Sequence, residues 1–316
     1  MKLIQKIFKI VFVGLIVLTL IVVALYGHSD MPLEDLKEKY AQSSSSFVSV
    51  DGMNVHFRDE GSINDTIPLV LLHGTGASLH TFNDWAYKLK QGYRVIRMDL
   101  PAYGLTGPFP NGDYSIDNYV HFIKNFLTAL GIEKCVLGGN SLGGNIAWNF
   151  ATQHPAMVHK LILIDASGYP TKPTSEPLAF KIPRMPVLKH AFKYITPYSV
   201  VKTSVENVYA DKSKVTEELV TRYFELTLRE GNRQAFIDRI KSKNDTTAYR
   251  KIKYIKHPSL VLWGAEDYLI PIENALRFHE DLPNDTLVIL KNVGHVPMEE
   301  SPSESLAVVI YFLERN

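Results

Sequence analysis

The chain has 316 residues, of which 46% are hydrophobic and 21% are charged, and its formal net charge is +1. This length allows one large domain with an insertion or two ordinary domains, and the composition favours a packed core over disorder. The near-neutral charge excludes a global basic field that would attract nucleic acid. The single cysteine, Cys135, excludes an intramolecular disulfide and a cysteine-based metal site.

The stretch 10–27 near the N-terminus carries no charged residue and follows Lys2, Lys6 and Lys9. As a helix it would extend roughly 27 Å, long enough to cross the hydrocarbon core of a membrane. We therefore expect an uncleaved N-terminal transmembrane anchor at 1–27, with the rest of the chain in the periplasm or outside the cell. The alternative is a signal peptide that is cleaved to give a secreted protein, but the stretch ends without a clear Ala-x-Ala cleavage site.

The segment 28–46 is polar, ends in a run of serines and is predicted to be a linker. A hairpin is predicted after it, at 47–50 and 55–59, around Asp51-Gly52. Further short apolar runs are typical of strands buried on both faces, and they lie at 69–73, 94–99, 135–139, 161–165, 260–263 and 287–290. Segments with helical periodicity lie at 116–130, 142–153 and 303–313.

The alternation of strands and helices predicts an α/β fold, with a mostly parallel central sheet flanked by helices. One stretch, 168–250, has no convincing strand signal; it is interrupted by prolines at first and becomes helical from about Lys214 onward. We interpret it as a helical cap inserted between two strands of the core. The predicted core then consists of 47–167 and 251–316.

The sequence Gly139-Asn140-Ser141-Leu142-Gly143 lies directly after a predicted strand and directly before a predicted helix. A tight strand-to-helix turn exposes a serine hydroxyl, and only small residues allow the close packing on both sides of it. Ser141 is therefore the candidate nucleophile. The backbone N–H of Leu142, at the positive end of the new helix, is a candidate donor to an oxyanion.

A second glycine-rich turn, His73-Gly74-Thr75-Gly76, ends the predicted strand at 69–73. Ligands bind at the carboxyl edge of open α/β sheets, so the backbone N–H of Thr75 is the second candidate oxyanion donor. The alternative is an ordinary turn after a strand. A phosphate-binding loop is disfavoured because the Gly-Lys-Ser/Thr ending is missing.

His295 follows the last predicted strand, and histidine suits a general base because its pKa lies near neutral pH. Asp267 follows the strand before it and would lie at the same sheet edge as Ser141, so it is the candidate acid that orients His295. Asp165, at the end of another strand, is the second candidate for this role, and Glu266 is the third. The chain order serine, aspartate, histidine is the order expected of this triad on such a sheet.

These motifs resemble the α/β-hydrolase superfamily over about 47–316, in particular capped bacterial esterases and lipases and membrane-bound monoacylglycerol lipases. The resemblance implies an α/β-hydrolase core, a serine esterase mechanism with an acyl-enzyme intermediate, and no cofactor. Ala102 and Thr106 stand where many members carry Gly and Ser, which we expect to adjust a loop rather than the chemistry. The matching motifs are His73-Gly74-Thr75-Gly76, Asp99-Leu100-Pro101-Ala102-Tyr103-Gly104, Gly139-Asn140-Ser141-Leu142-Gly143-Gly144, Leu163-Ile164-Asp165, Trp263-Gly264-Ala265-Glu266-Asp267 and Gly294-His295-Val296-Pro297-Met298-Glu299.

We expect the chain to cleave carboxylic esters, with medium-chain esters or monoacylglycerols as the substrate class. Apolar residues of the cap between 178 and 195 would line an acyl pocket, or would simply pack the cap onto the core. Basic residues of the same segment would face anionic lipid headgroups at the membrane. These basic residues are Lys181, Arg184, Lys189 and Lys193.

Three other functions are alternatives. Hydrolases that cleave carbon–carbon bonds in aromatic degradation share the motif around Ser141, although they commonly carry Trp where this chain has Val296. A non-catalytic ligand-binding module on the same fold would be expected to have lost part of the triad, whereas every candidate is present here. Dehalogenases and epoxide hydrolases use an aspartate nucleophile, and the serine at 141 argues against them.

Overall fold

The computed structural model describes residues 1–41, 44–186, 188–242 and 245–315. Parts of the predicted linker (42–43) and cap (187 and 243–244), together with residue 316, lie outside the described residues. In the described part, a single sheet has the strand order β1-β2-β4-β3-β5-β6-β7-β8. Its strands are β1 (Ser45–Val50), β2 (Met53–Glu60), β3 (Leu69–Leu72), β4 (Val95–Met98), β5 (Cys135–Asn140), β6 (Val158–Ile164), β7 (Ser259–Gly264) and β8 (Asp285–Leu290).

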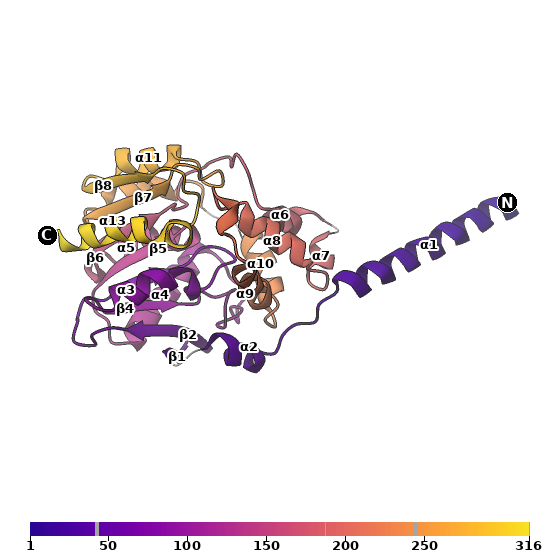
Figure 1. The fold of residues 1–316 in the computed structure, drawn as a ribbon, viewed down its shortest axis with the longest axis horizontal. Helices are drawn as coiled ribbons and strands as arrows, with labels where there is room; N and C mark the ends of the chain where they lie inside the picture. The colour runs from indigo at the N-terminus through magenta and orange to yellow at the C-terminus, as the bar shows by residue number, and fades with distance from the viewer. Residues whose placement is uncertain (42–43, 187, 243–244, 316) are drawn as a thin grey trace.

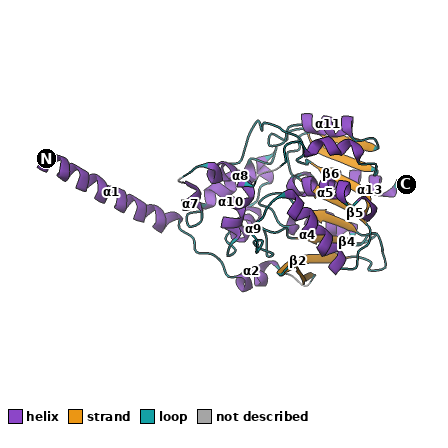
Figure 2. Ribbon diagram, turned by 180° about the vertical axis from the view of Figure 1, so that it is seen from behind, coloured by secondary structure: helices purple, strands orange, loops and turns teal. Residues whose placement is uncertain are grey.

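The sheet is mostly parallel, as the sequence predicts. The hairpin strand β1 pairs antiparallel with β2, and β2 pairs antiparallel with β4, whereas the remaining neighbours are parallel. Helices cover both faces of the sheet (Figures 1 and 2). They include α3 (Asn83–Leu89), α4 (Ile116–Ala129), α5 (Leu142–Gln153), α11 (Glu273–Asp281) and α13 (Pro302–Glu314).

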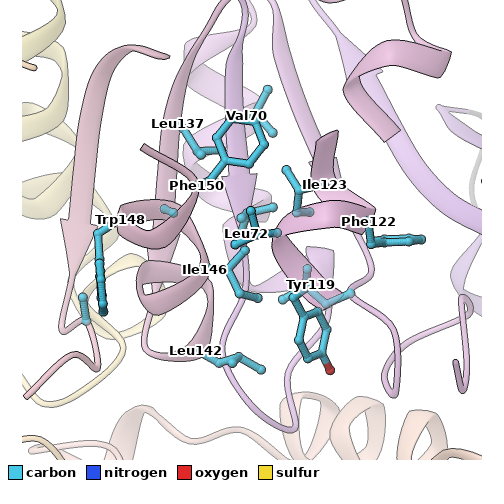
Figure 3. Packing of buried hydrophobic residues seen from close by; sticks show 14 of the residues in the cluster. Val70, Leu72, Tyr119, Phe122, Ile123, Leu137, Leu142, Ile146, Trp148 and Phe150 are labelled. Carbon is cyan, nitrogen blue, oxygen red and sulfur yellow. The ribbon is translucent and has the colours of Figure 1, made fainter. Parts of the chain in front are cut away.

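The two faces of the sheet build two separate parts of the core, as β3 illustrates. Val70 and Leu72 belong to one cluster, together with Tyr119 of α4 and Ile146 of α5. The other two residues of β3, Leu69 and Leu71, belong to a second cluster that contains Trp85 of α3. Successive side chains of a strand point to opposite faces, so a continuous apolar run indicates that both faces are covered. Figure 3 shows part of the first cluster, with labelled side chains from β3, α4 and α5.

Helix α4 forms where the sequence predicts a helix, at 116–130. The Ser115 side chain accepts a hydrogen bond from the N–H of Asn118 at the start of the helix. The chain leaves the helix at Gly131, which has a φ of 67°. One face of the helix is buried against the sheet, and its residues are Tyr119, Val120, Phe122, Ile123, Phe126 and Leu127.

The segment predicted to be a linker contains a short helix, α2 (Leu33–Tyr40). Its residue Leu36 is fully buried with Leu105 and Leu226. The Arg58 guanidinium also donates a hydrogen bond to the backbone oxygen of Tyr40 at 3.1 Å. This helix is therefore attached to the rest of the molecule through an apolar side chain and a buried charged group.

Between β6 and β7 the described residues contain helices and no strand. These helices gather on the side of the sheet from which the N-terminal helix extends (Figure 1). We propose to treat the region 168–250 as a cap on a core formed by 47–167 and 251–316. The helices of this region are α6 (Leu178–Lys181), α7 (Leu188–Phe192), α8 (Tyr198–Glu206), α9 (Glu217–Thr227) and α10 (Asn232–Lys241), with short 3-10 turns at Ile182–Arg184, Lys212–Lys214 and Ala248–Tyr254.

The predicted transmembrane anchor at 1–27 is wrong: in the described part of the chain, no helix is both long and apolar enough to cross a membrane. Helix α1 (Lys2–Tyr26) does form, but lysines occupy its first turns and it ends before Gly27, whose backbone is extended. The predicted membrane partner and the predicted membrane localisation are wrong for the same reason.

Candidate active site

Ser141 occupies the turn between β5 and α5. Its φ of 54° and ψ of −112° lie in a region that side-chain-bearing residues rarely adopt. Backbone hydrogen bonds hold the turn. The N–H of Ser141 donates to the backbone oxygen of Ile164, and the backbone oxygen of Ser141 accepts from the N–H groups of Asn145 and Ser167. A backbone fixed in this conformation projects the serine hydroxyl away from the sheet and the helix.

The glycines around Ser141 are required by the packing of the turn. A Cβ on Gly139 would lie 2.2 Å from the carbonyl carbon of Gly143, and a Cβ on Gly143 would lie 2.1 Å from the backbone oxygen of Leu72. No rotation of a side chain relieves contacts between backbone atoms. The Gly-x-Ser-x-Gly pattern therefore has a steric cause in this fold.

His295 lies in the loop after β8 and Asp267 in the loop after β7. The Nδ1 atom of His295 is 2.6 Å from Oδ2 of Asp267, and both side chains are buried. Because a carboxylate only accepts hydrogen bonds, Nδ1 carries the proton and Nε2 is left as the acceptor. The other Asp267 oxygen, Oδ1, accepts the N–H groups of Leu269 and Ile270, both at 2.9 Å, so the carboxylate is held in place on both sides.

The two weaker candidates for the acid are placed differently. Asp165 is fully buried at the end of β6, and its Oδ1 accepts the N–H of Gly264 at 2.9 Å. Glu266 accepts a hydrogen bond from the hydroxyl of Tyr268, an exposed side chain. The partner of the His295 ring is thus Asp267, the first choice made from the sequence.

Ser141 and His295 line one cavity, of about 760 Å³ including its opening to solvent. Thr75, from the loop after β3, lines the same cavity. Since these loops all follow the carboxyl ends of parallel strands, the candidates meet at one edge of the sheet. The structure therefore brings the predicted serine, histidine and glycine-rich turn together.

The two predicted oxyanion donors differ in how they are positioned. Leu142 is the first residue of α5, so its N–H has no acceptor within the helix and lies at the positive end of the helix dipole. The loop of Thr75 is fixed by His73, whose Nδ1 donates to the oxygen of Gly74 at 2.8 Å while its Nε2 accepts from the N–H of Leu100 at 2.9 Å. Burial lowers the pKa of His73, which keeps the ring neutral in this role.

Sequence reasoning missed a side chain that joins the serine turn to the histidine loop. The Nδ2 group of Asn140 donates to the backbone oxygen of His295 at 2.9 Å and to that of Ile164 at 3.2 Å. A Cβ on Gly74 would lie 2.8 Å from Oδ1 of Asn140, so this amide also borders the glycine-rich turn. Asn140 precedes Ser141 in the motif, but the sequence does not show which distant residues its side chain contacts.

Sequence reasoning also missed Glu300, which joins the histidine loop to the cap. Its buried carboxylate accepts the N–H of Gly294 at 2.6 Å, that of Asp211 at 2.7 Å and that of Ala210 at 3.2 Å. The N–H of His295 itself donates to the oxygen of Val208 at 2.9 Å. The loop that carries His295 is therefore held from the side of the cap.

We expect Glu300→Ala to lower the free energy of unfolding by at least about 2 kcal/mol, because buried N–H groups would be left without an acceptor. We expect kcat/KM to fall by about 10-fold or more, because the loop of His295 would lose its support. Urea unfolding and steady-state kinetics test both. Glu300→Gln keeps one acceptor oxygen and should recover part of each loss, and Glu38→Ala, an exposed change on α2, should alter stability by less than about 0.5 kcal/mol.

Asp165, Asp267 and His295 carry side chains of the kind that bind metal ions. Among the described residues they form a cluster in which one possible ligand atom of each lies within 4.8 Å of the others. Two ligands of a tetrahedral zinc ion, each about 2.0–2.2 Å from the metal, would lie more than about 3 Å apart. His295 and Asp267 are 2.6 Å apart and bonded directly. Their geometry is that of a hydrogen-bonded pair rather than of two metal ligands.

Comparisons with known proteins agree with this fold. A family model described as the alpha/beta hydrolase fold matches residues 67–302. The chain therefore belongs to the α/β-hydrolase family, and it is a hydrolase.

The similar proteins include hydrolases of more than one kind. The chain is 30% identical over 257 residues to the uncharacterized hydrolase YugF of Bacillus subtilis, covering 80% of this chain and 92% of that protein. It is 31% identical over 292 residues to the 2-hydroxy-6-oxononadienedioate/2-hydroxy-6-oxononatrienedioate hydrolase of Burkholderia vietnamiensis, covering 86% and 96%. A putative lipase from Acinetobacter baumannii has a TM-score of 0.74 and 25% identity, with 90% of this chain and 97% of that chain covered.

Proposed function

We propose that this protein is a serine hydrolase that cleaves carboxylic esters with an uncharged, apolar acyl group. Ser141 is the nucleophile, His295 the general base, and Asp267 the acid that orients it. The observation that carries the proposal is the direct 2.6 Å hydrogen bond between His295 and Asp267, with His295 and Ser141 on the wall of one apolar cavity.

The proposed cycle is acyl transfer. Nε2 of His295 takes the proton of the Ser141 hydroxyl while its oxygen attacks the ester carbonyl. The N–H groups of Thr75 and Leu142 stabilise the negative oxygen that forms. His295 then gives the proton to the leaving alcohol, and water repeats the sequence on the acyl-enzyme to release the acid.

The walls of the cavity support an apolar acyl group. None of the described residues that line it is Lys, Arg, Asp or Glu, and helices of the cap supply much of the lining. An apolar pocket with a few polar groups at one end orients a substrate by its reacting carbonyl. The apolar lining residues from the cap and the adjacent loops are Pro177, Ala179, Phe180, Phe192, Val201, Val205, Val208, Phe236, Leu269 and Val296.

Carbon–carbon bond hydrolysis, the alternative left by the sequence, is the second candidate, and its test substrate is the kind of 2-hydroxy-6-oxo-dienedioate for which the relative from Burkholderia vietnamiensis is named. The name of its substrate describes a dioate, which carries two carboxylates. A carboxylate buried in a site needs a cation or several hydrogen-bond donors, because the loss of its hydration is costly. The absence of a cation from the described lining of this cavity favours a neutral ester over such a dianion.

We expect kcat/KM for p-nitrophenyl esters to rise from acetate to medium-chain acids, because each buried methylene contributes about 0.8 kcal/mol. Medium-chain 1-monoacylglycerols, whose glycerol headgroup is uncharged, should also be cleaved. A 2-hydroxy-6-oxo-dienedioate should react at least about 100-fold more slowly than the best ester, because the described residues that line the cavity include no Lys or Arg to neutralise its carboxylates. A strict preference for acetate, or for the dioate, would contradict the proposal.

A further inference from the structure

Asp165 is a buried acid beside the candidate triad to which the proposed cycle gives no role. It directly follows β6, is fully buried and has a φ of 43°, in the left-handed region. Its N–H donates to the oxygen of Leu262, and its Oδ1 accepts the N–H of Gly264. Backbone contacts on both sides thus fix the direction of its carboxyl group.

The carboxyl group of Asp165 lies close to a negative neighbour, the carboxylate of Asp267. Oδ2 of Asp165 is buried and, within the described part of the chain, accepts no hydrogen bond. One oxygen of Asp165, one of Asp267 and one ring nitrogen of His295 all lie within 4.8 Å of one another. A buried oxygen in this position needs either a donor, which it lacks, or a proton of its own.

The two carboxyl groups are not equivalent. Asp267 receives two backbone N–H groups and the His295 ring, whereas Asp165 receives a single N–H. When two buried carboxyl groups lie this close, one of them retains a proton, and the one that accepts more hydrogen bonds ionises. Burial first, and then the charge of Asp267, raise the pKa of Asp165 well above its usual value, and the more distant Glu300 acts in the same direction.

We propose that Asp165 is a positioning residue: a neutral carboxylic acid whose Oδ2–H donates a hydrogen bond to the Asp267 carboxylate. This rests on the proposed role of Asp267 in orienting His295. The hydrogen bond gives the Asp267 carboxylate a further donor and limits its rotation. The pair then presents one negative charge to the imidazolium that forms during the reaction.

The proposal predicts the effect of two substitutions. Asp165→Asn should leave kcat/KM within about 3-fold, because its amide oxygen can accept from Gly264 while its NH₂ donates to Asp267. Asp165→Leu removes the donor to Asp267 and also the acceptor of the Gly264 N–H. It should lower kcat by about 100-fold, with KM little changed, because Asp267 keeps only its two backbone donors and orients the His295 ring less firmly. A loss in Asp165→Asn as large as that in Asp165→Leu would overturn the proposal.

The pH profile separates a neutral Asp165 from an ionised one. An ionised Asp165 would favour the imidazolium form of His295, so its removal would move the acid limb of kcat/KM to lower pH by about one unit or more. A neutral Asp165 predicts an unmoved acid limb in Asp165→Asn. A shift of that size would contradict the proposal.

Infrared spectroscopy tests the proton without using activity. We expect a carbonyl band of a protonated carboxylic acid at neutral pH in the wild-type protein and in Ser141→Ala, and its loss in Asp165→Asn. Absence of the band would end the inference even if the protein cleaves esters. Presence of the band in a protein that cleaves no ester would uphold the proton on Asp165 and end the proposed function instead, so the two failures are distinguishable.

Discussion

Replacing Ser141 by alanine is expected to lower kcat for an ester by about 10⁴–10⁶-fold, because the nucleophile is removed and only binding and oxyanion stabilisation remain. The melting temperature should change little, since the strained turn is held by backbone hydrogen bonds to Ile164, Asn145 and Ser167 that alanine retains. Steady-state kinetics with a medium-chain p-nitrophenyl ester and thermal unfolding measure the two effects.

Ser204→Ala is the matched control for this change. Ser204 lines the same cavity, but its hydroxyl donates to the backbone oxygen of Val200 within α8. Its loss should alter kcat by less than about 10-fold, because it takes no part in the proposed chemistry. Near-normal turnover in Ser141→Ala would show that Ser141 is not the nucleophile, and an equal loss in Ser204→Ala would show that the effect is not specific to Ser141.

Asp267→Asn is expected to lower kcat by about 10⁴-fold with the fold intact. The asparagine oxygen can still accept the N–H groups of Leu269 and Ile270, but an amide NH₂ directed at His295 would favour the tautomer with the proton on Nε2. The ring then cannot act as a base toward Ser141, and the imidazolium loses its counter-charge. Steady-state kinetics and circular dichroism test the two halves of this expectation.

The controls for Asp267→Asn are the same acid-to-amide change at the two neighbouring carboxyl groups. Glu266→Gln should be nearly silent, because Glu266 contacts Tyr268 rather than His295. Asp165→Asn should also be mild, since a neutral donor replaces a neutral donor. If either of these changes cost as much as Asp267→Asn, the assignment of the orienting acid would have to move.

The central strands could be predicted from the sequence because their physical signal is local. β3, β5 and β7 are buried along their whole length, and each appears as a short, continuous apolar run. Helices α3 and α11 were not predicted. α3 has seven residues and α11 has nine. Both are shorter than the window of about 11–18 residues over which helical periodicity is recognised.

Some residues of the candidate site could likewise be predicted from local sequence, and others could not. Ser141 and His295 are marked by the residues immediately around them, and so is the turn of Thr75. Asp267 could be ranked above Asp165 only by its place after the strand that precedes the histidine strand. Glu300 could not be recognised, because its importance comes from contacts with Ala210 and Asp211, about 90 residues away in the chain. Contacts of this kind depend on how the cap sits against the core, which no local pattern specifies.

The identity of the nucleophile is tested most directly by trapping the acyl-enzyme. The protein is mixed with a medium-chain p-nitrophenyl ester, quenched in acid, digested and analysed by peptide mass spectrometry. The account predicts an acyl group on the peptide that contains Ser141 and no acyl group on the same peptide of Ser141→Ala. An acyl group on another residue, with Ser141 unmodified during turnover, would contradict it.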